Sequence, residues 1–387
     1  MLLYIFGNMK HRPGILTGGG HISTFHAGMD GILAVCPEAV GFIDGYEGLH
    51  ERKYVTLKRK DIPTYRAGSM LGCTRGKVDI EKAKEAMLDA EVDSLIVMGG
   101  DDHLGEAAKL AEAGVNVYGW PKTMDNDLSR TAFTAGYITA AKNAARVIRN
   151  AYNCAMTNRK AVLIPMFGRN ADWVVAAAGM WGGAPLIVPG EKYVEGGDEE
   201  RYSIEQIYAK VQEEYETNRA TYGRPFAVVP VSEGADISGL DSHLREDEVD
   251  EHNNPKIEPM KLALVLKDAF NEIGGSDMPV AIDCITYDAM RNCDPDSSDL
   301  RLSYNAGVRV AKAARDLEPS GCVIFRQNKV FEDLAPLSEV SETRFLRPEG
   351  FIDYDTMTVD PSFGNCYKLL FGPPVEKDEL VYDILKR

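Results

Sequence analysis

Residues 94–127 constrain the fold of this chain more than any other stretch. The apolar run at residues 95–98 is too short for a helix, and its aliphatic side chains are typical of a buried parallel strand. The motif GGDD at residues 99–102 ends the run, and its glycines allow a tight turn and a close backbone approach. The pattern therefore predicts a strand that opens onto a helix with two carboxylates at the turn.

A second short strand is predicted at residues 115–118, and the motif PKTMDND follows it at residues 121–127. Neighbouring parallel strands end at the same edge of their sheet, so we expect two carboxylate-bearing loops to leave that edge together. Farther along the chain, strand-like and helix-like patterns continue to alternate. This alternation predicts an α/β fold.

These residue types suit phosphoryl transfer, in which catalysis is mainly positioning and neutralisation of charged oxygens. Asp101 or Asp102 can hold Mg²⁺ through a carboxylate, and Lys122 can face a phosphate. Asp125 or Asp127 can accept the proton of the attacking hydroxyl. A second interpretation stays open at this point: both motifs are ordinary turns whose aspartates cap helices, because Gly and Asp dominate turns for conformational reasons.

The composition limits the partners of this chain. Its 387 residues can bury one large or two moderate cores, and a hydrophobic content of 44% is ordinary for a globular protein. The formal net charge of −16 argues against nucleic acid or an anionic membrane as the main partner, since both are polyanions. Any phosphate site must therefore be a local basic pocket in an acidic protein.

The seven cysteines are scattered, odd in number and without a CxxC pair, which indicates reduced thiols rather than disulfides or a zinc site. No apolar run reaches membrane-spanning length, and the first residues lack a signal-peptide cleavage pattern. We therefore expect a cytoplasmic location and no membrane partner.

The remaining pattern predicts further helices and strands and one long loop. Helices are expected at residues 23–36, 79–90, 170–180 and 259–273, from the residue after 134–136 to about residue 150, and from residue 203 onward. Strands are expected at residues 14–17, 40–43, 161–166, 226–231 and 280–284. The segment 238–259 is dense in Asp, Glu and Asn, so it is predicted to be a solvated loop.

GGDD followed by PKTMDND resembles the phosphofructokinase family, whose members carry similar motifs at this separation. Further blocks agree in family order: GILTGGG at 14–20, DGYEGL at 44–49, GCTR at 72–75, TAGYITA at 134–140, FGRNADW at 167–173 and VSEGA at 231–235. The resemblance covers about the first 240 residues well and the remainder poorly. It implies two Rossmann-like lobes with mainly parallel sheets.

The same resemblance implies a division of labour between the lobes. Residues 1–145, completed by part of 285–387, would bind the phosphoryl donor, and residues 146–284 would bind the acceptor. Family members assemble as dimers or tetramers, so a homodimer or homotetramer is expected. They use Mg²⁺, which is the expected cofactor.

The family motifs also imply roles for individual residues. The catalytic residues would be Asp125 as general base, Asp127 as its electrostatic partner and Arg169, with Asp101 organising the metal. The donor would contact Gly19, Tyr46, Arg75, Asp102, Lys122 and Thr123. The acceptor would contact Thr123, Asp125, Phe167, Gly168, Arg169, Glu233 and Arg291.

Two positions point to the donor. Nucleotide-using members of the family have glycines where this chain has Asp102 and Lys122, and those glycines leave room for a nucleoside. A carboxylate and a long cationic side chain would fill that space, which resembles the pyrophosphate-dependent branch. The resemblance therefore implies transfer from pyrophosphate, nominally to fructose 6-phosphate.

The chain departs from the family pattern in two places. After the glycines at 18–20, the usual Asp, Pro and Asn are missing, and His21 and His26 are either functional replacements or packed side chains. In the late acceptor segment Arg291 survives, but the family His does not, and acidic residues crowd the region. Three alternatives stay open: the nominal reaction, a kinase-like activity on a less charged sugar or polyol, and a non-catalytic ligand-binding relative.

Overall fold

The computed structural model describes residues 11–168, 171–190, 202–235, 237–238, 244–249, 255–257, 259–326, 333–346 and 349–386. The chain forms two compact units. Unit 1 comprises Met1–Thr139 with Arg291–Arg344, and unit 2 comprises Ala140–Met290 with Phe345–Arg387. Each unit is built around its own parallel sheet.

In the described part of unit 1, eight strands form one sheet in the order β13-β12-β5-β4-β1-β2-β3, with β6 paired to β5. These strands are β1 (Pro13–Thr17), β2 (Val40–Phe42), β3 (Tyr54–Thr56), β4 (Ser94–Gly99), β5 (Val117–Thr123), β6 (Ala135–Gly136), β12 (Gly321–Val323) and β13 (Leu334–Ala335). The pairs around β1, β4 and β5 are parallel, and only the outer pairs β2-β3 and β12-β13 are antiparallel. The predicted α/β class is confirmed.

The central strand β4 is the apolar run from which the sequence argument started. Ile96 pairs with Ile15 on one side and with Tyr118 on the other, and every residue of the strand is buried. Because β4 and β5 are parallel neighbours, the GGDD turn and the MDND turn leave the same edge of the sheet. That juxtaposition is the one predicted from the sequence. The strand β5 is longer than the predicted 115–118 and includes Pro121, Lys122 and Thr123.

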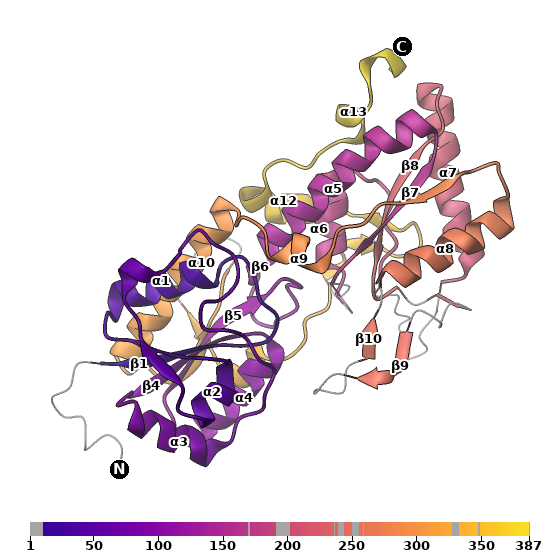
Figure 1. Ribbon diagram of the computed structural model, residues 1–387. Helices are drawn as coiled ribbons and strands as arrows, with labels where there is room; N and C mark the ends of the chain where they lie inside the picture. The colour runs from indigo at the N-terminus through magenta and orange to yellow at the C-terminus, as the bar shows by residue number, and fades with distance from the viewer. Residues whose placement is uncertain are drawn as a thin grey trace. The chain divides into compact units, whose positions relative to one another are not determined.

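Helices cover both faces of this sheet (Figure 1). On one face lie α1 (Phe25–Val35) and α10 (Ser297–Arg315), and on the other lie α2 (Gly45–His50), α3 (Ile80–Asp89) and α4 (Asp101–Glu112). The Asp79 side chain caps α3, since its carboxylate accepts the backbone N–H of Lys82 at 3.1 Å. The helix α11 (Leu337–Val340) packs against α4.

The pair α1 and α10 packs at backbone contact distance. A Cβ atom placed on Gly31 would lie 2.0 Å from the Tyr304 carbonyl oxygen, and one on Gly307 would lie 2.1 Å from the Gly28 carbonyl oxygen. Only glycine permits so close an approach of two helix backbones. The contact holds α1, and with it the loop at its N-terminal end, against the sheet.

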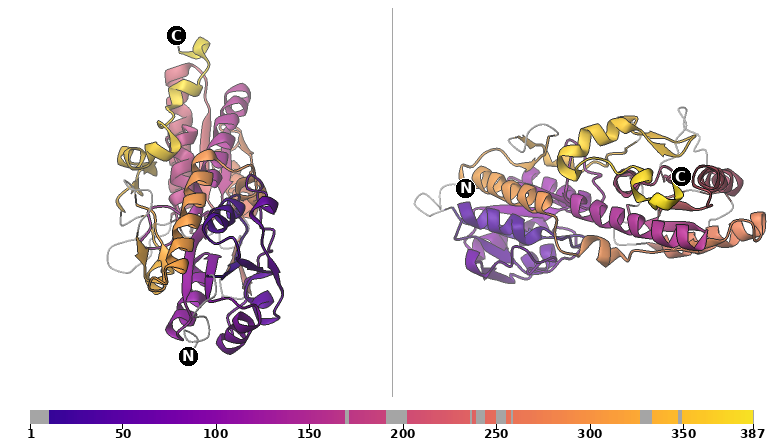
Figure 2. Two further views of the ribbon diagram at one scale, coloured as in Figure 1. Left: turned by 90° about the vertical axis from the view of Figure 1, so that its left-hand side faces the viewer. Right: turned by 90° about the horizontal axis from the view of Figure 1, so that it is seen from above.

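The helix α5 (Tyr137–Asn158) runs without interruption from unit 1 into unit 2 (Figure 2). It ends about two turns beyond the predicted end near residue 150. The extra turns keep an apolar face, since Tyr152, Ala155 and Met156 are all buried. Burial of that face, which the Ala-rich pattern alone did not indicate, extends the helix.

Unit 2 has a three-stranded parallel sheet in the order β11-β7-β8. Its described elements are β7 (Ala161–Met166), α6 (Trp173–Gly182), α7 (Ile204–Tyr222), β8 (Ala227–Ser232), α8 (Pro259–Gly274), β11 (Val280–Ile282), α9 (Tyr287–Arg291), the ribbon β14 (Ile352–Asp353) with β15 (Thr358–Val359), α12 (Pro361–Phe371) and α13 (Lys377–Leu380). A capping box begins α7: the Gln206 side chain accepts the Ser203 N–H at 2.8 Å, and the Ser203 hydroxyl accepts the Gln206 N–H at 3.1 Å.

The prediction of a loop throughout residues 238–259 is wrong. The structure has an antiparallel ribbon there, formed by β9 (Leu244–Val249) and β10 (Pro255–Ile257). The density of charged residues gave no sign of this backbone pairing, because two strands of a ribbon can satisfy each other's hydrogen bonds without an apolar face.

The Gly307→Ala substitution tests the helix contact. The added methyl group must push two backbones apart, so we expect a loss of about 1–3 kcal/mol in the free energy of unfolding, measured by urea denaturation. Gly105→Ala in α4 is the matched control, since its nearest neighbours lie 4.0 Å away. The control should gain up to about 1 kcal/mol from helix propensity. Equal stability of both variants would contradict the proposed close contact.

Candidate active site

The turn at residues 18–20, hereafter the glycine turn, lies at the end of β1. The Gly18 N–H donates to the Met98 carbonyl at 3.1 Å, and the Gly19 N–H donates to the Thr74 carbonyl at 2.9 Å. Gly19 has a φ of +75°, a conformation that other residues rarely adopt. The turn is thereby held between the end of β4 and the loop at residues 72–75.

The Lys122 side chain lies under this turn. It is only 4% exposed, and its Nζ donates to the Gly20 carbonyl at 2.8 Å. A Cβ on Gly19 would lie 2.9 Å from the same Nζ. An ammonium group has three N–H donors, so the bond to Gly20 leaves capacity for a ligand.

Several charged groups surround this ammonium. Burial lowers the pKa of Lys122, and the guanidinium of Arg291 lowers it further, whereas Cys73, Asp101 and Asp125 act in the opposite direction. A buried cation with a lowered pKa is poised to be stabilised by an anion. Lys122, predicted as a donor residue, is thus close to both Asp101 and Asp125.

The DND turn that follows β5 is held rigidly. Asn126 is fully buried at a φ of +58°, and its side-chain amide donates to the Ala132 carbonyl at 3.3 Å. The Arg344 guanidinium donates to the Asn126 carbonyl at 3.1 Å. Thr123 Oγ1 accepts the backbone N–H of Asp125 at 3.1 Å, which places both predicted residues side by side. The aspartates on either side of Asn126 therefore have a fixed backbone.

Asp127 is strongly perturbed. Burial raises the pKa of its carboxyl group well above the ordinary value, and the negative charges of Asp125 and Asp101 raise it further. A carboxyl group whose pKa is raised beside a second carboxylate is typical of sites with distinct acid and base roles.

The predicted metal residue Asp101 begins α4 and is exposed, and Asp102 beside it is half-buried. Among the described residues no three Asp, Glu, His or Cys side chains are arranged as a preformed metal cage. Mg²⁺ usually takes one or two carboxylates together with substrate phosphates, so this carboxylate set fits a metal that arrives with a phosphate ligand.

Arg75 is exposed and follows the backbone that contacts the glycine turn. The loop before it is tied to β1, because the Thr17 hydroxyl donates to the Gly72 carbonyl and lies 2.9 Å from Ser69 Oγ. Arg75 therefore extends from a fixed backbone beside the glycine turn, and its contact with the donor stays a prediction.

The structure contradicts the predicted contact of Tyr46 with the donor. The Tyr46 side chain is fully buried, its hydroxyl donates to the His103 carbonyl at 3.0 Å, and its ring stacks on the His103 ring at 5.3 Å. His103 in turn lies against Gly18, where a Cβ would be 1.9 Å from the imidazole. Tyr46 supports the glycine turn through His103 and has no surface left for a donor.

The two histidines of the altered loop have different places. His26 is 3% exposed, its Nδ1 donates to the Arg66 carbonyl at 2.6 Å, and its Nε2 accepts the Met70 N–H at 3.0 Å. It therefore pins the 66–70 backbone, which favours the packed alternative for this histidine. His21 is half-buried.

The predicted acceptor residues in unit 2 meet at the ends of β7 and β8. The Gly168 N–H donates to Glu233 Oε1 at 2.8 Å, and the Glu233 N–H donates to the Met166 carbonyl at 2.9 Å. Phe167, which lies between Met166 and Gly168 in the chain, is half-buried. Arg169 lies outside the described residues. The parallel pairing of β7 with β8 therefore brings three predicted residues together.

Arg291 was predicted to contact the acceptor, and that role stays a prediction. Arg291 belongs to unit 1, and a Cβ on Gly20 would lie 2.5 Å from its Nη1. Two nearby acidic residues are used by the fold. Asp299 accepts the N–H groups of Gly136 and Thr139 at 3.1 and 3.0 Å, and Asp296 caps α10. Their carboxylates therefore do not argue against a phosphorylated acceptor.

Sequence reasoning missed three supporting residues. His103 underlies the glycine turn, Cys73 lies within the electrostatic reach of Lys122, and Arg344 holds the DND turn. His103 follows GGDD directly, so its neighbourhood could have been suspected. Arg344 is 218 residues from its partner Asn126, and no local sequence pattern predicts this contact.

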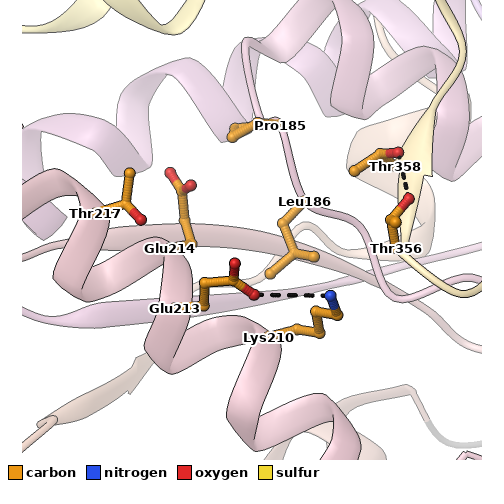
Figure 3. Close-up of a pocket in the computed structure, with 8 residues that line it drawn as sticks. All are labelled: Pro185, Leu186, Lys210, Glu213, Glu214, Thr217, Thr356 and Thr358. Carbon is orange, nitrogen blue, oxygen red and sulfur yellow. Dashed lines mark hydrogen bonds and ion pairs between the residues drawn. The ribbon is translucent and has the colours of Figure 1, made fainter.

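A separate cavity of about 260 Å³ lies in unit 2, between α7, the 185–186 segment and the β14-β15 ribbon (Figure 3). It is lined by Pro185, Leu186, Lys210, Glu213, Glu214, Thr217, Thr356 and Thr358. Figure 3 shows Lys210 directed at Glu213, 3.7 Å away. With two carboxylates and one paired cation, the cavity does not suit a phosphate ligand, and it contains none of the predicted residues.

Comparison with known proteins agrees with this fold and these motifs. The family model for phosphofructokinase matches residues 12–313. A pyrophosphate–fructose 6-phosphate 1-phosphotransferase of Amycolatopsis methanolica is 30% identical over 357 residues, which cover 88% of this chain and 99% of the relative. An ATP-dependent 6-phosphofructokinase of Mycobacterium bovis is 28% identical over 358 residues, with 88% and 98% covered.

The solved structure of a pyrophosphate-dependent phosphofructokinase from Nitrosospira multiformis has the same fold, with a TM-score of 0.78 over 98% of this chain and 96% of that one at 18% identity. The fold and the family match define the class of this protein as a phosphotransferase. The chain belongs to the phosphofructokinase family. No described helix combines the length and the apolar character needed to cross a membrane.

Tyr46→Phe tests the reassignment of Tyr46. Loss of the hydroxyl leaves the His103 carbonyl without this donor, so we expect a loss of about 1 kcal/mol in the free energy of unfolding. The Michaelis constant of the phosphoryl donor should stay within about twofold, because the hydroxyl does not reach a ligand. A large rise in that constant with unchanged stability would restore the original prediction of direct contact.

Proposed function

We propose that the protein transfers a phosphoryl group from pyrophosphate to the 1-hydroxyl of fructose 6-phosphate, with Mg²⁺ bound to the donor. The observation that carries this proposal is the buried ammonium of Lys122, bonded to Gly20 under the glycine turn and within electrostatic reach of Asp125. A long cationic side chain at this position takes the room that a nucleoside would need and offers a phosphate ligand instead. Relatives that are pyrophosphate–fructose 6-phosphate 1-phosphotransferases support the same donor.

In the proposed mechanism, Asp125 accepts the proton of the acceptor hydroxyl, and the resulting oxygen attacks the near phosphorus of the donor. The bond between that phosphorus and the bridging oxygen breaks, and inorganic phosphate leaves. The raised pKa of Asp127 favours its protonated form, so Asp125 is the member of the pair that remains available as the base.

Other residues position the two substrates. Lys122 and the backbone of Gly19 bind the phosphates of the donor, and Arg75 contacts the donor from the loop beside the glycine turn. When bound, Mg²⁺ would neutralise charge on the phosphate oxygens, and Asp101 is the residue proposed to hold it. In unit 2, Glu233 and the backbone of Phe167 and Gly168 are proposed to contact the sugar. The role of Arg169 stays a prediction, as do assembly into a homodimer or homotetramer and a cytoplasmic location.

Asp125→Asn removes the base while keeping the size of the side chain. We expect kcat to fall by about 10²–10⁴-fold, with Michaelis constants changed much less, because the proton transfer occurs only in the transition state. Steady-state kinetics with pyrophosphate, Mg²⁺ and fructose 6-phosphate provides the measurement. Asp316→Asn, at an exposed carboxylate paired with Arg315, is the control and should be unaffected. Near-normal turnover of the Asp125 variant would remove this residue from the base role.

The double substitution Lys122→Gly with Asp102→Gly tests donor choice. Loss of a charge-assisted contact should weaken pyrophosphate use by about tenfold or more, and the vacated space should admit ATP. Lys122→Met is the matched control, because it removes the charge and keeps the bulk, so pyrophosphate use should fall without a gain of ATP use. An unaltered protein that prefers ATP in a donor competition assay would overturn the proposal. A protein inactive with either donor but able to bind sugar phosphates would indicate a ligand-binding relative.

A further inference from the structure

Asp172 immediately precedes the helix α6, four residues after Gly168, and its side chain is completely buried. The Gly190 N–H donates to its Oδ1 at 2.6 Å, and the Tyr354 hydroxyl donates to its Oδ2 at 3.2 Å. Burying a carboxylate is costly unless hydrogen bonds replace its contacts with water, so these two partners hold it firmly. The side chain thereby joins three segments of unit 2 that lie far apart in the sequence.

The first of these partners, Gly190, packs against the end of β8. The residues just before it run beside that strand, because the Ser232 N–H donates to the Val188 carbonyl at 2.8 Å. A Cβ on Gly190 would lie 2.9 Å from Ser232 Oγ and 3.1 Å from the carbonyl carbon of Gly234. The backbone of Gly190 is therefore in close contact with the residues on both sides of Glu233.

The second partner, Tyr354, is connected to the chain farther along, after Glu233. Its carbonyl accepts the Tyr202 hydroxyl at 2.9 Å. Tyr202 pairs with Ile237 in an isolated parallel bridge, and the Tyr202 carbonyl accepts the Ser238 N–H at 2.8 Å. The buried carboxylate is thus connected by two separate routes to the backbone before and after Glu233.

Glu233 is the carboxylate proposed to contact the sugar, and its use depends on where it lies. It is 5% exposed, and its Oε1 accepts the Gly168 N–H at 2.8 Å. A hydrogen bond to a substrate weakens steeply when its geometry is lost, and a misplacement of about 1 Å can cost about 10²-fold in activity. The backbone that carries Glu233 must therefore be held in place as well as its side chain.

We propose that Asp172 is a positioning residue for the acceptor: it fixes the backbone around Glu233 relative to Phe167 and Gly168, so that together they fit a sugar. This inference rests on the proposed function and adds a residue that acts through Glu233 without touching either substrate. The residues that carry it belong to unit 2, whereas the glycine turn and Lys122 belong to unit 1. Loss of Asp172 should therefore impair the acceptor and spare pyrophosphate.

Equilibrium binding of fructose 6-phosphate to the full chain, measured by calorimetry without a donor, provides the first test. Asp172→Ala removes both hydrogen bonds and should weaken this binding by about tenfold or more. Asp172→Asn keeps an acceptor for the Gly190 N–H and should recover most of the loss. Binding of pyrophosphate with Mg²⁺ should change by less than about twofold in either variant, because distant sites behave independently.

Tyr354→Phe provides a milder test, since it removes one of the two bonds and keeps the ring. Binding of fructose 6-phosphate should weaken by about threefold or more. Tyr222→Phe is the matched control: its hydroxyl also bonds a carboxylate of unit 2, that of Asp378. Tyr222 stacks on Phe226, at the opposite end of β8 from Ser232. The control should lose stability in thermal unfolding and bind the sugar phosphate normally.

A double variant tests whether Asp172 acts through Glu233. If it does, Asp172→Ala and Glu233→Gln impair the same sugar contact, and their combined loss of affinity should be smaller than the product of the separate losses. A combined loss equal to the full product would contradict the positioning role, since it would show that the two residues act independently.

The outcomes separate this inference from the proposed function. A wild-type protein that binds no fructose 6-phosphate overturns both. A wild type that binds it but forms no product with pyrophosphate overturns the proposed function, and sugar binding by the variants still decides the inference. If Asp172→Ala and Tyr354→Phe bind fructose 6-phosphate as the wild type does, or if they lose pyrophosphate binding equally, the inference alone fails. Should Asp172→Ala not fold, Tyr354→Phe and its control decide.

Discussion

The burial of one ammonium group beneath a glycine turn is the constraint on which the rest of the site depends. Removing the Lys122 cation from water is costly, and a single hydrogen bond to the Gly20 carbonyl offsets only part of that cost. The arrangement requires β1 and β5 to flank β4 in the sheet, because the glycine turn follows β1 and Lys122 lies near the end of β5. It also requires glycine at position 19, where the φ of +75° and the close Nζ exclude a larger residue.

The carboxylates near this cation are held just as firmly. Asn126 fixes the DND turn from inside, and Arg344 fixes it from the far end of the chain. Burial raises the pKa of Asp127, and because the backbone holds Asp125 and Asp127 near each other, their repulsion raises it further. A rigid backbone thus converts the proximity of two like charges into an asymmetry that acid–base chemistry can use.

The sequence predicted the parts of this site that depend on local pattern. Strand β4 was readable from its apolar run, and the adjacency of the GGDD and PKTMDND loops followed from the rule that parallel strands end at one edge. Tyr46 was misjudged because a tyrosine in a turn gives no sign of whether its ring points out or in, and here His103 covers it. The β9-β10 ribbon was missed because charge patterning reports solvent exposure and not backbone pairing.

From the sequence alone one could determine the α/β class, the family and the residue types available for phosphoryl transfer, because each depends on short-range spacing. Only the tertiary structure decided which of those residues lie close to one another in space. It brought both Arg291 and Lys122 against Gly20 and buried His26 and Tyr46 as supports. The reason is physical: charge and hydrogen bonding act over a few ångströms in space, and residues about 270 positions apart acquire such distances only when strands and helices pack.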